Sequence, residues 1–110
     1  MKYYVLRLVN HKHKQVFYRV EEDPMGKDSL GHYVDWATNK VKKGKVKSML
    51  PYHQSVAKHL AKHGRKYVEQ QVIAVVNASN AQTARKQTLR ERRAYGVVDK
   101  MLGYTKMSKI

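Results

Sequence analysis

The fold of this chain is decided by the stretch Tyr3-Tyr4-Val5-Leu6-Arg7-Leu8-Val9-Asn10. Its tyrosine, valine and leucine residues are typical of a β-strand. A second apolar segment, residues 15–21, follows after a short polar connection, and this spacing predicts a β-hairpin. The chain is therefore expected to begin with two paired strands.

Two helices are predicted between this hairpin and the next strand. The first is expected to begin near Asp28 or Ser29, either of which could cap it, and to run to about Asn39. The second is expected to begin at Pro51, which suits a first helical turn, and to end before Gly64. Both segments carry apolar residues at helical spacing, so each is expected to pack one side on the sheet.

The C-terminal half is predicted to supply a third strand and further helices. Residues 67–76 form an almost continuous apolar run, which predicts a buried strand in the middle of the sheet. Ser79 and Gln82 form a capping-box pattern, so a third helix is expected from Ala81 to Ala94. Residues 95–110 are expected to add a short fourth helix before a frayed tail.

The predicted fold class is α+β, with a small, three-stranded, mainly antiparallel sheet flanked by three to four helices in the order ββααβα. A length of 110 residues suits one compact domain. Residues 1–96 are assigned to a nucleic-acid-binding domain. Residues 97–110 are assigned to a C-terminal helical extension and tail.

The composition is strongly basic, with 23 Lys and Arg against 8 Asp and Glu and a net charge of +15. Such a surface attracts polyanions, which favours nucleic acid as the partner, or less often an anionic membrane face. No apolar run approaches the ~20 residues that span a bilayer, so no membrane partner is expected. The charged N-terminus does not resemble a signal peptide, and a cytoplasmic protein associated with nucleic acid is therefore expected.

Several other kinds of site are not predicted. The absence of cysteine excludes disulfides and cysteine zinc sites, and no cofactor is expected. His59 and His63 have a spacing that can hold zinc, but both are expected to lie opposite the apolar side of their helix, as solvated or phosphate-contacting residues. Trp36, the only tryptophan, is expected in the core rather than as a platform for stacking bases.

Two segments concentrate the positive charge. Residues 40–47 hold five lysines in eight residues, and their mutual repulsion predicts an exposed loop. The third helix carries five cations that cover an arc of roughly 160°, against the single acid Glu91. These cations are Arg85, Lys86, Arg90, Arg92 and Arg93. Like charges one turn apart destabilise an isolated helix, so an anionic partner is expected on this helix.

Five short motifs occur in the order of the predicted elements. They are Tyr4–Asn10 on the first strand, Tyr18-Arg19-Val20 on the second, Lys27 with His32 near the first helix, the basic segment Ala57–Gly64, and Val72-Ile73 before an alanine-containing helix. In order and spacing they resemble the GIY-YIG nuclease domain. The resemblance covers Tyr3 to about Tyr95, and it implies a fold evolved to hold DNA.

The resemblance also implies a set of catalytic positions, most of which are substituted here. Members of that family use a tyrosine from each of the first two motifs, an arginine on the first helix, and a glutamate on the last helix that holds one divalent cation. The glutamate position falls on Arg85, whose guanidinium cannot ligate Mg²⁺ and would repel it. The first-motif tyrosine falls on Leu6, although the tyrosines nearby leave room for a slipped register, and the arginine becomes Lys27.

Only Tyr18 matches its family position, and it is assigned a relic catalytic position. No catalytic residue and no metal ligand is predicted, which favours a binding protein over an enzyme. Arg19, Lys27 and Arg85, with Lys86 as a further candidate, would together clamp a phosphate where such nucleases cleave. The full set of expected nucleic-acid contacts comprises Arg19, Lys27, His32, Lys40, Lys42, Lys43, Lys45, Lys47, Arg85, Lys86, Arg90 and Arg93.

Three functions are consistent with these patterns. The first is a DNA-binding protein that holds the phosphate backbone without cleaving it, of the kind a phage or mobile element could use to compete for DNA sites or shield them. The second is a divergent but active metal-dependent endonuclease whose acid comes from Glu69 or Glu91. The third is an RNA-binding or ribosome-associated protein, for which the basic charge alone would be sufficient.

Overall fold

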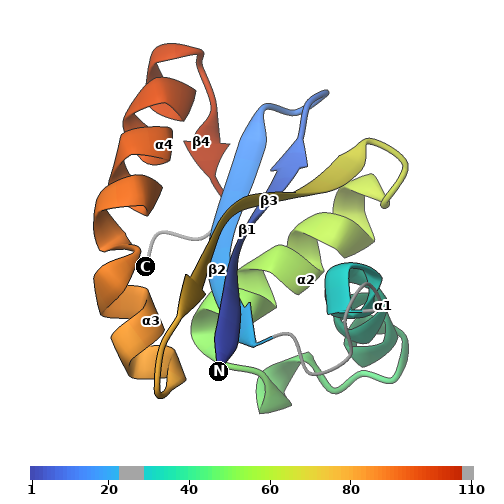
Figure 1. The fold of residues 1–110 in the computed structure, drawn as a ribbon. Coiled ribbons are helices and arrows are strands. Elements are labelled where there is room, and N and C mark those ends of the chain that lie inside the picture. Colours follow the sequence, from blue (N-terminus) through green and yellow to red (C-terminus); the bar gives the residue numbers. More distant parts are fainter. Residues whose placement is uncertain (23–28, 108–110) are drawn as a thin grey trace.

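The computed structural model describes residues 1–22 and 29–107, and those residues form an α+β fold with four α-helices and a four-stranded mixed sheet. The strands lie in the order β3-β1-β2-β4. Helices α1 and α2 cover one face of the sheet, and α3 and α4 cover the other (Figure 1). The elements are β1 (Lys2–Asn10), β2 (Gln15–Glu22), α1 (Ser29–Lys42), a short 3-10 helix η2 (Val46–Ser48), α2 (Pro51–His63), β3 (Val68–Asn77), α3 (Ala81–Gln87), α4 (Leu89–Met101) and β4 (Thr105–Lys106).

Strand β1 is the centre of the sheet. It pairs antiparallel with β2, from Tyr3 opposite Glu22 to Asn10 opposite Gln15. On its other side it pairs antiparallel with β3, with a shift of register between Val5 and Leu6 that marks a bulge. Most of β1 is buried, because helices cover both faces of the strand and neighbouring strands lie along both edges.

The two faces of the sheet are packed differently. On one face, Leu8 and Phe17 contact a large apolar cluster from α1 and α2 that includes Val56 and Leu60. On the other face, a smaller cluster joins Tyr3 of β1 to Ala78 and to Ala84 of α3. The larger core therefore lies between the sheet and the α1–α2 layer.

The predicted central position of the third strand is wrong. Strand β3 lies at the edge of the sheet, and its Val72 and Val75 side chains are 44% and 49% exposed. An apolar run indicates a strand but not its neighbours. Here β1 takes the centre because it is apolar on both faces, whereas β3 has the polar residues Glu69, Gln70 and Gln71 directly after its first residue.

The predicted frayed tail instead contributes a strand. The backbone N–H of Thr105 donates to the carbonyl of Lys14 at 2.9 Å, and that of Met107 donates to Val16 at 2.8 Å. These bonds place β4 parallel to β2, so the sheet is mixed and four-stranded rather than three-stranded and antiparallel. The chain reverses after α4 at Gly103, whose φ of 87° favours glycine.

The predicted third helix is divided in two at Thr88. The Thr88 side chain is buried, and its Oγ1 donates to the carbonyl of Ala84 at 2.7 Å. Such back-bonding is a common cause of helix bending. Helix α4 then continues to Met101, across residue 96 where the sequence places the end of the domain. Residues after 96 therefore supply both the end of α4 and strand β4.

Candidate nucleic-acid interface

Four exposed cationic residues lie along α3 and α4, and they are called the basic face here: Arg85, Lys86, Arg90 and Arg93. Within residues 1–22 and 29–107, none of the four lies within ion-pair distance of a carboxylate. Beside them, Arg92 donates from Nη2 to the carbonyl of Arg85 at 2.7 Å. Burial and the charges of Arg85 and Arg93 lower the pKa of Arg92. Like charges are thus gathered on these helices without neutralising partners.

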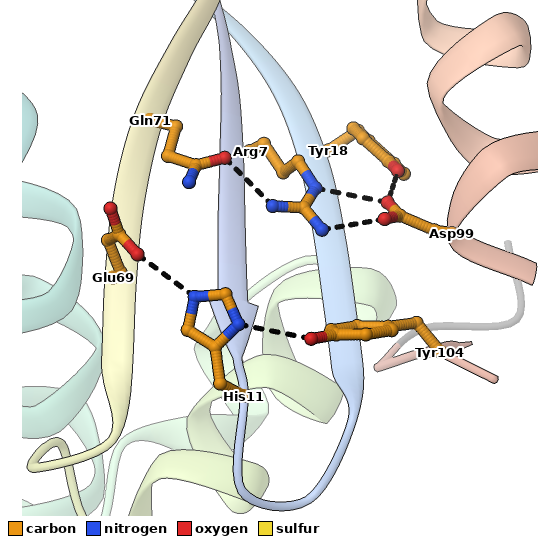
Figure 2. A network of polar contacts seen from close by, with 7 residues as sticks. All are labelled: Arg7, His11, Tyr18, Glu69, Gln71, Asp99 and Tyr104. Carbon is orange, nitrogen blue, oxygen red and sulfur yellow. Dashed lines mark hydrogen bonds and ion pairs between the residues drawn. The ribbon is translucent and has the colours of Figure 1, made fainter. Parts of the chain in front are cut away.

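A buried ion pair joins α4 to the sheet (Figure 2). Arg7 of β1 donates from Nε to Asp99 Oδ2 at 3.0 Å and from Nη2 to Asp99 Oδ1 at 2.6 Å. Its Nη1 donates to Gln71 Oε1 of β3 at 2.8 Å, and the hydroxyl of Tyr18 of β2 donates to Asp99. Three strands and α4 are therefore tied together by one guanidinium and one carboxylate.

The electrostatics of this network fix its protonation. Burial works to raise the pKa of Asp99, but hydrogen bonds from Arg7 and Tyr18 outweigh it and hold that pKa below its usual value. Burial and the adjacent Asp99 carboxylate raise the pKa of Tyr18. The carboxylate is ionised and the phenol protonated at neutral pH, so Tyr18 acts as a donor to Asp99.

Sequence reasoning missed Arg7 and Asp99 as a pair. Each carried a signal, because Arg7 interrupts an apolar strand and Asp99 interrupts the apolar residues of a helix. A charged residue in such a position needs a partner when it is buried. The pattern could not indicate which partner, since the two residues are 92 positions apart.

A groove of about 1140 Å³ runs along β2 between the two helical layers, and it is called the β2 groove here. One wall comes from α1 and the start of α2, and the other from Arg85 and Arg92. The lining residues are Phe17, Tyr18, Arg19, Val20, Glu21, His32, Tyr33, Asp35, Trp36, Asn39, Leu50, Tyr52, His53, Arg85 and Arg92. The groove therefore combines aromatic rings with arginines.

Arg19 forms part of this groove and is 8% exposed. Its Nη2 donates to Gln70 Oε1 at 3.0 Å and lies 3.0 Å from the Glu21 carboxylate, while its guanidinium lies 4.0 Å from the centre of the Tyr33 ring. Its Nε and Nη1 have no hydrogen-bond partner among the described residues. Burial lowers the pKa of Arg19, although Glu21 opposes the shift.

The structure brings together some of the predicted contact residues. Arg19, His32 and Arg85 line the β2 groove together with Tyr18, whereas Arg93 lines a second cavity of about 830 Å³ between α4 and β2. Lys86 and Arg90 are exposed on the same two helices as Arg85 and Arg93. Lys27 lies outside the described residues.

The lysine-rich segment lies apart from the basic face. The loop predicted for residues 40–47 is partly wrong, because α1 continues through Lys40 to Lys42 and Lys47 lies in η2. Lys43 and Lys45 connect these two elements. The segment covers the end of α1 and the start of η2, and α1 belongs to the layer that packs on the opposite face of the sheet from α3 and α4 (Figure 1).

The predicted solvent exposure of His59 is wrong. His59 is buried, and its Nε2 lies 3.1 Å from Asn10 Nδ2. Asn10 Oδ1 accepts the backbone N–H of His13, so Nδ2 is the donor that faces the imidazole. Burial, with nearby positive charge, lowers the pKa of His59 to about 4. The ring satisfies a buried amide, and no group of three or more potential ligands that could hold a metal ion is present among the described residues.

The predicted core position of Trp36 is also wrong. Its side chain is 39% exposed and lines the β2 groove. The indole packs at its base on Tyr33 and His53, with ring centres 5.8 and 5.4 Å away. The helical pattern placed Trp36 near the apolar side of α1, but the residues of that side that reach the core are Tyr33, Val34 and Ala37, and Trp36 lies at its margin.

No family model, curated protein or solved structure matches this chain. Among the described residues, none of the helices is both long and apolar enough to cross a bilayer. The features that bear on function are therefore the basic face, the buried ion pair and the β2 groove.

Proposed function

We propose that this protein binds nucleic acid, and foremost double-stranded DNA, through the phosphate backbone and without cleaving it. The observation that carries the proposal is the basic face, whose four cations have no carboxylate partner among the described residues. Clustered like charges are unfavourable in the free protein. A phosphate backbone relieves that repulsion and releases counterions on binding.

The environment of Tyr18 supports binding without cleavage. Metal-assisted hydrolysis needs carboxylates that are free to hold a cation and orient water. The carboxylate in contact with Tyr18 is Asp99, and Arg7 already binds both of its oxygens. The side chain of Arg85 lines the same groove as Tyr18. A cation would therefore meet positive charge where a nuclease needs negative charge.

The proposal includes a degenerate GIY-YIG-like domain. It is supported by the antiparallel unit β3-β1-β2 within the larger sheet, by two helices between β2 and β3, and by a helix directly after β3. It is also supported by the common groove of Tyr18 and Arg85. A protein of this kind could occupy or shield DNA sites on behalf of a phage or mobile element.

The test removes the basic face and measures the salt dependence of DNA binding. Arg85, Lys86, Arg90 and Arg93 are replaced together by glutamine. If all four contact phosphates, the slope of log affinity against log salt should fall by about 3 to 4. The matched control replaces four exposed lysines elsewhere by glutamine, namely Lys12, Lys58, Lys62 and Lys66.

The control has the same net charge, so it separates a specific surface from overall positive charge. The proposal expects the slope of the control to change much less than that of the basic-face variant. An equal decrease of the salt slope in the two variants would reject the basic face as the binding surface. Tighter binding to an RNA duplex than to a DNA duplex at equal salt would replace DNA by RNA as the partner.

A further inference from the structure

We infer that the β2 groove is a binding site for an unpaired nucleotide segment, in which a base stacks on Trp36 and the adjoining phosphate contacts Arg85 and Arg92. This inference rests on the proposed function and extends it to a second surface. The basic face would hold a duplex, while the groove would hold single-stranded nucleic acid next to it.

The groove follows a strand edge that the sheet leaves largely open. Strand β4 pairs with β2 only at Gln15 and Val16. Beyond these residues, from Phe17 to Glu21, the strand lines the groove and no other described strand pairs with its outer edge. A chain of small cross-section can therefore lie between the α1–α2 layer and the α3–α4 layer.

One wall of the groove is a rigid group of rings. Tyr52 and His53 have ring centres 4.2 Å apart, and His53 lies 5.4 Å from Trp36 with the two ring planes perpendicular. The Tyr33 hydroxyl lies 2.7 Å from His53 Nδ1 and fixes that imidazole. Burial and the charge of Arg19 lower the pKa of His53, so the ring is neutral at pH 7. The indole of Trp36 therefore packs on Tyr33 and His53, while the rest of its side chain remains exposed.

The charges of the groove favour an anion. Its two acids are occupied, because Glu21 lies 3.0 Å from Arg19 and Asp35 is ion-paired with Arg65. Arg85 and Arg92 on the opposite wall have no such partner among the described residues. A ligand that spans the groove would meet an aromatic ring on one side and guanidinium groups on the other. Nucleotides offer both a planar base and a phosphate.

The exposed indole selects unpaired bases over a duplex. In a double helix each base is stacked between its neighbours, so its face is not available to a protein ring. In a single strand every base presents a face, and aromatic side chains bind it without regard to sequence. The backbone contacts of the basic face do not require unpaired bases. The two surfaces share Arg85, but the remaining residues of each should therefore respond to different forms of DNA.

The experiment uses the fluorescence of Trp36, which is the only tryptophan in the chain. The full protein is titrated with oligothymidine and, separately, with a blunt DNA duplex of the same length. Stacking of a base on the indole should quench the emission with oligothymidine, and much less with the duplex. In parallel, anisotropy of labelled DNA measures the affinity for both forms.

The decisive variants are Trp36→Ala and Trp36→Phe. Loss of the ring should weaken oligothymidine binding by about tenfold or more, and duplex binding by less than twofold. The phenylalanine variant keeps a stacking face and should lose less, which controls for any effect of Trp36→Ala on folding. The matched control is Arg90→Gln, outside the groove, which should weaken duplex binding and leave the quenching by oligothymidine in place.

Three results would overturn the inference. The first is normal duplex binding with no quenching by oligothymidine, which leaves the proposed function intact. The second is an equal loss of affinity for oligothymidine and for the duplex in the Trp36→Ala variant. The third is quenching by a glutamate-rich peptide but not by oligothymidine, which would assign the open edge of β2 to strand addition by a protein. A protein that binds neither form of DNA would instead reject the proposed function.

Discussion

The two helical layers of this protein are held on the sheet by different kinds of interaction. The α1–α2 layer packs through a continuous apolar cluster that includes Leu8, Val56 and Leu60. In α4 the one buried residue is Asp99, and apolar residues such as Val98 are exposed. The first layer is held by burial of apolar surface, whereas α4 is held by an ion pair. The layer that carries the unpaired arginines is thus the layer that contributes least to the core.

The largest effect is expected when the ion pair that holds α4 is broken. Asp99→Ala leaves the buried guanidinium of Arg7 without its partner, which should lower the free energy of unfolding by about 3 to 5 kcal/mol. Urea unfolding measures the loss, and hydrogen exchange should show α4 opening first. The double variant Arg7→Met with Asp99→Leu removes both charges and should recover much of the stability. A loss under about 1 kcal/mol in Asp99→Ala would mean that the pair is not what holds α4.

The opposite layer should respond to loss of apolar volume. Leu60→Ala leaves a cavity in the α1–α2 core and should cost about 2 to 4 kcal/mol in urea unfolding. The matched change in the other layer is Val98→Ala, where the side chain is 53% exposed, and it should cost less than about 0.5 kcal/mol. Equal costs at the two sites would contradict the contrast between the layers.

The sequence was sufficient for elements whose limits are set locally. Pro51 suits a first helical turn and Gly64 has a φ of 74°, and helix α2 runs between these two residues. The hairpin likewise follows from its two apolar segments and short polar connection. Such signals depend on the conformation of a few neighbouring residues, so they can be found without knowing the rest of the fold.

Features that depend on distant partners could not be predicted. The edge position of β3 follows from β1 taking the place between β3 and β2, and an apolar run does not encode which strand takes that place. The burial of His59 depends on Asn10, 49 residues away, which supplies the donor that a helix-face argument overlooks. Among the candidate site residues, the run of cations on α3 and α4 could be predicted from the sequence, but its separation from the lysine-rich segment could not.

The interface between the hairpin and α2 should weaken in acid. His59 has its pKa lowered to about 4, so the folded protein keeps the ring neutral while the unfolded chain binds a proton below about 6.5. The contribution of His59 is complete above pH 6.5 and is lost progressively as the pH falls toward 4. The total loss should be roughly 3 kcal/mol in urea unfolding, because each pKa unit corresponds to about 1.4 kcal/mol.

The matched variant for this pH effect is His59→Gln, which keeps an acceptor for Asn10 and cannot titrate. The difference in stability between the two proteins should therefore change with pH between about 6.5 and 4 and be constant above that range. His13 and His63 lie close to His59, with ring centres 6.4 and 4.7 Å away, and both are present in the two proteins. A difference that does not vary with pH would show that His59 is not the group responsible for the acid sensitivity.

The smallest effect is expected at Tyr18. This residue distinguishes a protein that only binds DNA from an active metal-dependent nuclease. If Tyr18 only donates to Asp99, then Tyr18→Phe should cost about 1 kcal/mol of stability and leave DNA affinity unchanged, because Arg7 still binds both carboxylate oxygens. Plasmid DNA incubated with Mg²⁺ or Mn²⁺ should stay intact with either protein. Metal-dependent cleavage by the wild type that Tyr18→Phe abolishes would instead identify an active nuclease, and the Arg7–Asp99 pair would then have to open to release a carboxylate for the cation.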